Sequence, residues 1–107
     1  MEKTEQTERI RVMEEKMRRA VEALSSLTAA LEAYDEARED FRSLAAYYGS
    51  AQWRQDFEDD EAGKLPPAEE LPRGVLSEDG IYDLLDLERD LLLRMAETAG
   101  ERMEETV

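Results

Sequence analysis

The sequence contains no cysteine and no histidine. Without cysteine the chain can form neither a disulfide, a thiolate metal site nor a cysteine nucleophile. Without histidine it lacks an imidazole base, the serine-histidine catalytic pair and the commonest nitrogen ligand of zinc. These absences exclude many enzyme classes, so we expect no catalytic residue, no metal and no cofactor. A catalytic pair of carboxylates is left open, because nearly any acid-rich sequence offers one.

Long apolar runs are missing as well. No uncharged apolar stretch approaches the roughly 18–20 residues that span a bilayer. The first five residues lack the basic start and apolar core of a signal peptide. We therefore expect a cytoplasmic protein.

Charge of one sign predominates, with 28 Asp and Glu against 14 Lys and Arg and a formal net charge of −14. This charge repels phosphate backbones and anionic lipid surfaces. Neither nucleic acid nor a membrane is therefore an expected partner.

Glycine and proline are absent from Thr4 to Tyr48, where good helix formers prevail. Apolar residues recur there at alternating steps of three and four, which predicts a long helix over about 4–48 in a bundle or coiled coil. The stripe comprises Ile10, Met13, Met17, Ala20, Leu24, Leu27, Leu31, Tyr34, Phe41, Ala45 and Tyr48.

Two glycines and a serine delimit a short middle helix. Gly49 is predicted to end the long helix in a left-handed conformation. Ser50 is predicted to cap a helix over about 51–62, which Gly63 ends.

A proline-containing loop over 63–76 follows, and a last helix is predicted over about 78–104 with Ser77 as its cap. Its apolar residues gather on one face. With 107 residues the chain is expected to be a single all-helical domain, 1–107. The predicted fold class is all-α, an elongated antiparallel helical hairpin with coiled-coil-like packing.

An antiparallel hairpin with Tyr48 level with Glu78 places Arg38 opposite Glu88. Both residues interrupt the apolar face of their helices. We hypothesise an Arg38–Glu88 ion pair that specifies the register of the two helices. The alternative is that both side chains extend to solvent.

The same register leaves the residues before Val21 without a partner helix. Ile10, Met13 and Met17 nevertheless continue the apolar stripe there, and an exposed stripe suggests a second chain. We predict a homodimer in which these three residues form the contact. The alternative is a frayed N-terminus.

An acidic run, from Asp56 to Glu61, suggests a cation site. It does not match the EF-hand pattern, which has glycine at the sixth position of the loop and glutamate at the twelfth. Counted from Asp56, these positions hold Glu61 and Pro67. A looser site for magnesium, manganese or calcium would use two aspartates of this run with acids near the last helix. Its members would be Asp56 and Asp60 together with Glu78, Asp79 or Asp83. The alternative is a solvated acidic face.

Aromatic residues bracket the first turn of the chain. Tyr47, Tyr48 and Trp53 would form either a ligand-binding platform or the packed end of a helical hairpin. Arg73 would either hold an anionic ligand or pair with a nearby carboxylate such as Asp79.

The segment Arg-Gly-Val-Leu-Ser-Glu-Asp at Arg73–Asp79, together with Trp53, Asp56 and Asp60, resembles the bacterial domain-of-unknown-function family 4298. The resemblance implies a bacterial origin and no assigned activity. We predict a functional site where the middle helix meets the Arg73–Asp79 turn. The candidate residues are Trp53, Asp56, Asp60, Arg73, Ser77, Glu78 and Asp79.

Three functions remain open at this point. The first is a dimeric, non-enzymatic interaction or adaptor module that engages an unidentified protein partner. The second is a protein or enzyme that binds a divalent cation or small ligand with carboxylates near the Arg73–Asp79 turn. The third is an acidic mimic of nucleic acid.

Overall fold

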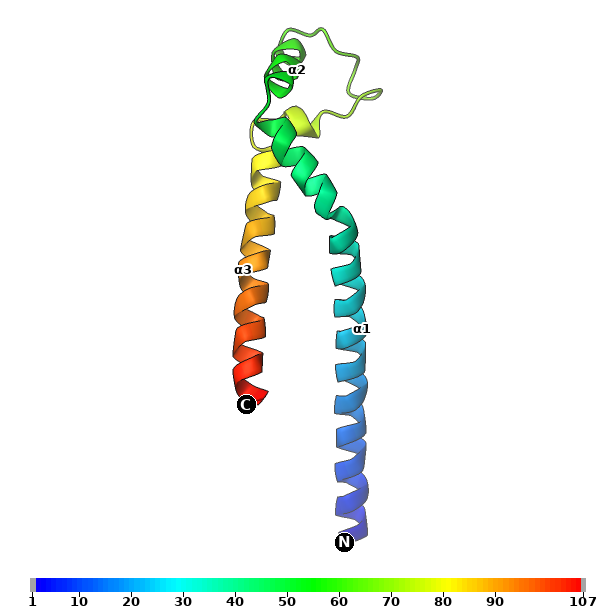
Figure 1. Ribbon diagram of the computed structural model, residues 1–107. Helices are drawn as coiled ribbons and strands as arrows, with labels where there is room; N and C mark the ends of the chain where they lie inside the picture. The colour runs from blue at the N-terminus through cyan, green and yellow to red at the C-terminus, as the bar shows by residue number, and fades with distance from the viewer. Residues whose placement is uncertain (1, 107) are drawn as a thin grey trace. The chain divides into compact units, whose positions relative to one another are not determined.

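The computed structural model describes residues 2–106, which are mostly helical and contain no strand. Three α-helices are present in this part of the chain: α1 (Glu2–Tyr48), α2 (Ala51–Glu61) and α3 (Gly80–Thr106). A short 3-10 helix, η1 (Gly74–Leu76), precedes α3 (Figure 1). The predicted all-α fold class is confirmed.

The chain divides into two compact units, Met1–Arg38 and Glu39–Val107, with the boundary inside α1. The described residues of the first unit all belong to α1, up to Arg38. The second unit contains the end of α1, α2, η1 and α3. The single domain predicted from chain length stays a prediction.

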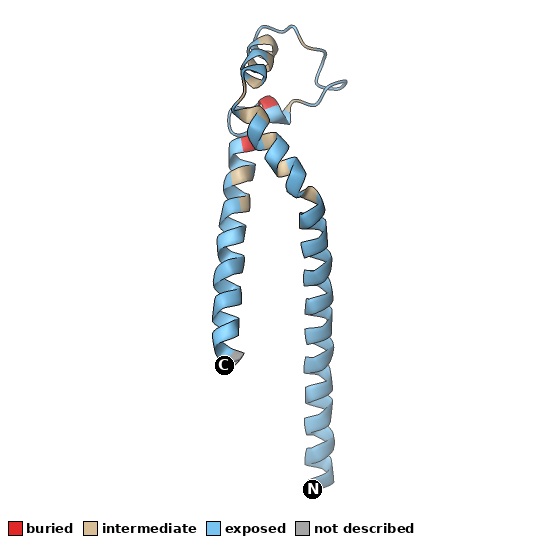
Figure 2. Cartoon of the chain, viewed as in Figure 1, coloured by how far each residue is buried: buried red, intermediate tan, exposed pale blue. Residues whose placement is uncertain are grey.

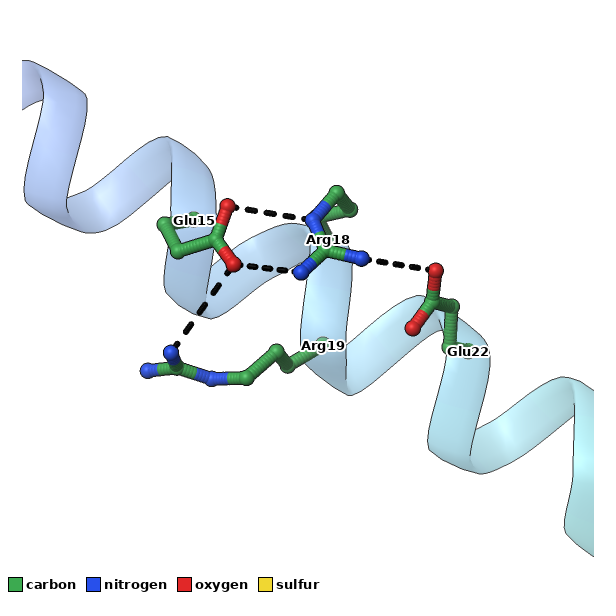
Figure 3. A network of polar contacts seen from close by, with 4 residues as sticks. All are labelled: Glu15, Arg18, Arg19 and Glu22. Atoms are coloured by element: carbon green, nitrogen blue, oxygen red, sulfur yellow. Dashed lines mark hydrogen bonds and ion pairs between the residues drawn. The ribbon is translucent and has the colours of Figure 1, made fainter.

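In the first unit, charged side chains one turn apart support the helix. Arg18 contacts Glu15 through two nitrogens and lies 2.7 Å from Glu22 through Nη1, while Arg19 lies 3.9 Å from Glu15 (Figure 3). The hydrogen bond from Arg18 lowers the pKa of the Glu15 carboxyl. Such pairs at spacings of three and four favour an isolated helix.

The connection from α1 to α2 differs from the prediction at Gly49. Among the described residues a positive φ occurs at Gly63, so the left-handed conformation expected for Gly49 is wrong. The chain turns instead because the Ser50 amide bonds to the Tyr47 carbonyl at 2.9 Å. Ser50 is the predicted N-cap of α2, since its Oγ accepts a 3.1 Å hydrogen bond from the Trp53 amide.

Helix α2 ends where Gly63 adopts a φ of 71°. The Gly63 amide bonds to the Asp60 carbonyl at 3.0 Å, and the Lys64 amide bonds to the Asp59 carbonyl at 2.9 Å. These two bonds form a Schellman motif, in which a left-handed glycine satisfies the last carbonyls of a helix. The predicted role of Gly63 is confirmed.

The last helix begins two residues later than predicted, at Gly80. Ser77 Oγ accepts a 3.0 Å hydrogen bond from the Gly80 amide, as a capping side chain does, and donates one of 2.8 Å to the Gly74 carbonyl. A Cβ atom on Gly80 would collide with the Gly74 carbonyl oxygen and the Ser77 hydroxyl. The turn between η1 and α3 therefore requires glycine at this position.

The most buried side chains of the second unit flank this turn. Leu76 in η1 is 6% exposed and Ile81 in α3 is 2% exposed. Figure 2 shows this burial in η1 and at the start of α3, while the rest of α3 is mostly exposed. Half-buried side chains of the same unit complete the core: Phe41, Leu44, Tyr47, Tyr48, Trp53, Phe57, Leu65 and Leu85. The core of this unit thus lies where η1 meets its neighbouring helices.

Candidate functional site

Trp53 joins α2 to η1. Its indole Nε1–H donates a 2.9 Å hydrogen bond to the carbonyl of Val75. The Trp53 ring stacks on Phe57 with a centroid distance of 5.3 Å and meets Tyr48 edge-on at 5.1 Å. These contacts favour the interpretation of the aromatic residues as packed core over the ligand platform.

A second contact joins the end of α1 to α2. The Tyr47 hydroxyl donates a 2.6 Å hydrogen bond to Oδ2 of Asp56, and both residues are half-buried. Burial, followed by the hydrogen bond and charge of Asp56, raises the pKa of Tyr47 to about 12. The carboxylate of Asp56 is therefore used within the unit as an acceptor for a neutral phenol.

Arg73 pairs with the last turn of α2. Its Nε lies 2.8 Å from Oδ1 of Asp60, and its Nη1 donates to the carbonyl of Pro66. The prediction that Arg73 pairs with a nearby carboxylate is confirmed, and the carboxylate is that of Asp60 instead of the suggested Asp79. Arg73 precedes η1 and reaches back to α2, whereas the backbone of Asp79 belongs to the start of α3, where its carbonyl accepts from the Asp83 amide at 2.8 Å.

Glu78 contributes to the fold through its backbone. Its carbonyl accepts a long hydrogen bond of 3.4 Å from the Tyr48 hydroxyl. The side chain of Tyr48 thus reaches the turn that precedes α3. The side chains of Glu78 and Asp79 are exposed.

The predicted site residues thus fall into two groups. Trp53, Asp56, Asp60 and Arg73 each bond to another part of the second unit. Ser77 caps the start of α3, and the two acids that follow it face solvent. The first group makes contacts between separate segments of the unit, whereas Ser77 bonds only to nearby backbone groups.

The acidic residues do not assemble into a cation site. Over residues 2–106, no group of three acidic side chains is arranged to hold a metal ion. Asp56 accepts from Tyr47, and Asp60 pairs with Arg73. The structure therefore offers no support for the looser carboxylate site.

Sequence reasoning missed three residues that take part in the contacts of the second unit. The carbonyls of Val75 and Pro66 carry no residue-specific signal, since any residue supplies a carbonyl. Gly80 did carry a signal, because glycine in the first turn of a helix is unfavourable unless a close approach requires it.

The predicted dimer residues are exposed on α1, with Ile10 at 53%, Met13 at 56% and Met17 at 63%. Further apolar residues of α1 are exposed along the chain: Val21, Leu24, Leu27 and Leu31. Nothing in the first unit covers this stripe, because the described residues of that unit all belong to α1.

The ion pair between Arg38 and Glu88 stays a prediction. Arg38 lies in the first unit, where its Nη1 is 3.7 Å from Oδ1 of Asp35. Glu88 lies in the second unit and is half-buried on α3.

None of the described helices combines the length and the apolar character that crossing a membrane requires. No curated protein and no protein of known structure matches the chain. The model of a family described as "Domain of unknown function (DUF4298)" matches residues 10–98. This stretch contains the whole cluster around the Arg73–Asp79 turn and the exposed stripe of α1. The match covers most of the 107 residues, and the protein therefore belongs to the DUF4298 family.

Proposed function

We propose that this protein is a non-enzymatic interaction module that acts as a homodimer through α1. The observation that carries the proposal is the exposure of Ile10, Met13 and Met17 on the part of α1 that forms the first compact unit. An isolated helix gains little stability from its backbone alone, and most helices in proteins depend on the packing of an apolar face.

Burial of this face supplies the driving force for association. Removing apolar surface from water contributes roughly 25 cal/mol per Å². The apolar residues recur at steps of three and four, which is the spacing that keeps a seam facing a partner helix. A second copy of the same helix offers a matching seam and needs no other component.

The cluster around the Arg73–Asp79 turn supports this proposal in a different way. Its tryptophan, tyrosine and arginine side chains are bound within the second unit, as a scaffold requires. The exposed acids Glu78 and Asp79 beside this scaffold offer a negatively charged surface. We infer that the adaptor function uses this surface for a protein partner with a basic face.

The homodimer can be tested by light scattering on purified protein at micromolar concentration. We expect twice the 12.3 kDa chain mass for the wild type. Met17→Glu places a charge in the seam and is expected to give a monomer. The matched control Ala29→Glu adds the same charge to the opposite face of α1 and is expected to remain dimeric. A monomeric wild type would overturn the proposal.

A further inference from the structure

Charge is distributed unevenly along α1. Residues 9–19 contain five basic and two acidic side chains, a net charge of +3, and Figure 3 shows part of this segment. Residues 20–40 contain one basic and six acidic side chains, a net charge of −5. The helix therefore has a basic segment followed by an acidic one.

The part of the apolar stripe of α1 between Ile10 and Tyr34 is symmetric about Glu22. Counted outward from Glu22, its members fall at equal distances on both sides, so that a reversed copy of the helix presents the same pattern. The four resulting pairs are Ile10 with Tyr34, Met13 with Leu31, Met17 with Leu27, and Ala20 with Leu24. This part of the stripe spans about 36 Å of helix at roughly 1.5 Å per residue.

Parallel and antiparallel pairing of two such helices differ in their electrostatics. A parallel pair in register places the basic segment 9–19 beside its own copy, which brings like charges together. An antiparallel pair centred on Glu22 places this segment beside residues 25–35, which carry Glu32 and Asp35 and no basic residue. Charge complementarity of this kind sets register and orientation at an interface.

The sizes of the side chains favour the same arrangement. A parallel pair stacks Ala20 on Ala20 and leaves space in that layer, whereas the antiparallel pair places Ala20 against the larger Leu24. Interiors gain stability when large and small side chains alternate across a seam and leave no void.

We propose that the α1 helices of two copies pack antiparallel about a two-fold axis near Glu22. This arrangement rests on the proposed homodimer and extends its contact over the stretch from Ile10 to Tyr34. The interface is isologous, so each residue pair occurs twice. Leu24, Leu27 and Leu31 are exposed in the structure and are therefore available for it.

Disulfide cross-linking provides the test, because the natural chain has no cysteine. Chains carrying Met13→Cys and chains carrying Leu31→Cys are purified separately, mixed in equal amounts and oxidised. The antiparallel dimer brings residue 13 of one copy to residue 31 of the other, within the roughly 4.4–6.8 Å Cα separation of a disulfide. We expect a 13–31 cross-link by mass spectrometry in the mixture and little cross-linking of either variant alone.

Different results have different meanings. Efficient cross-linking of Met13→Cys alone indicates a parallel dimer and overturns the orientation while leaving the homodimer intact. The register is overturned if the mixture is dimeric by light scattering before oxidation but yields no 13–31 cross-link after oxidation. A monomeric wild type overturns the proposed function itself. The outward-facing variant Ala29→Cys controls for random collisions and is expected to cross-link in neither orientation.

Discussion

Arg73 and Asp60 form an ion pair that joins the loop before η1 to the last turn of α2, with Nε and Oδ1 2.8 Å apart. Their side chains are only 25% and 28% exposed, and the same guanidinium donates to the Pro66 carbonyl. Partial shielding from water strengthens such a pair relative to a surface ion pair. Arg73 therefore links the loop before η1 to α2 within this unit.

This pair gives the first prediction. Arg73→Ala and Asp60→Ala are each expected to destabilise the second unit, and the double variant is expected to show a coupling free energy of about 1 kcal/mol. Urea unfolding followed by the fluorescence of Trp53, the single tryptophan, measures it. Arg102→Ala serves as the control, since Arg102 and Glu105 are each 68% exposed and no measurable change is expected. Additive effects of the two substitutions would refute the coupling.

The second prediction concerns pH. The pKa of Tyr47 is raised to about 12, so the folded protein favours the neutral phenol. The stability that this group contributes is complete below the ordinary tyrosine pKa of about 10 and is lost as the pH rises through 10 to 12. We expect the free energy of unfolding to fall in this window and Tyr47→Phe to remove that part of the decrease.

Absorbance titration at alkaline pH tests the same group independently. A tyrosine ionisation near pH 12 is expected in the wild type, and this late step is expected to disappear in Tyr47→Phe. Tyr82→Phe is the control, because Tyr82 is exposed on α3. Loss of the late step in Tyr82→Phe would contradict the assignment.

The third prediction concerns Gly80. A Cβ atom there meets the Gly74 carbonyl and the Ser77 hydroxyl, so Gly80→Ala is expected to destabilise the unit by about 1–3 kcal/mol. Gly100→Ala adds the same methyl group to the same helix, where no atom lies within 4 Å. It is expected to stabilise α3 by about 0.5–1 kcal/mol through helix propensity. Thermal unfolding by circular dichroism compares the two, and equal shifts would contradict the prediction.

The fourth prediction concerns the indole of Trp53. Trp53→Phe keeps an aromatic ring near Phe57 but removes the hydrogen bond to the Val75 carbonyl, at an expected cost of about 1–2 kcal/mol. Urea unfolding followed by circular dichroism measures the change. Gln52→Ala, at an exposed neighbouring position, is expected to leave stability nearly unchanged. An unaltered midpoint in Trp53→Phe would show that η1 does not depend on this bond.

Several features of the fold follow from local signals. Helix-forming residues without glycine or proline predict α1 up to Tyr48, and Ser50 and Gly63 mark the ends of α2 because capping depends on nearby backbone groups. The local rule that a glycine after a helix is left-handed gave a wrong prediction at Gly49. The Ser50 amide bonds to the Tyr47 carbonyl, so the turn forms without a left-handed residue.

The sequence by itself determined the helical class and the end of α1 at Tyr48. It also indicated that α2 meets the turn around Arg73. Only the tertiary structure decided how those residues are used. Arg73 pairs with Asp60 rather than Asp79. Trp53 donates to the backbone carbonyl of Val75, which the sequence cannot indicate because every residue has a carbonyl. The physical reason is that helix formation and capping depend on residues within about one turn. The partner of a long polar side chain depends instead on which distant backbone and carboxylate atoms the packing brings within hydrogen-bond distance.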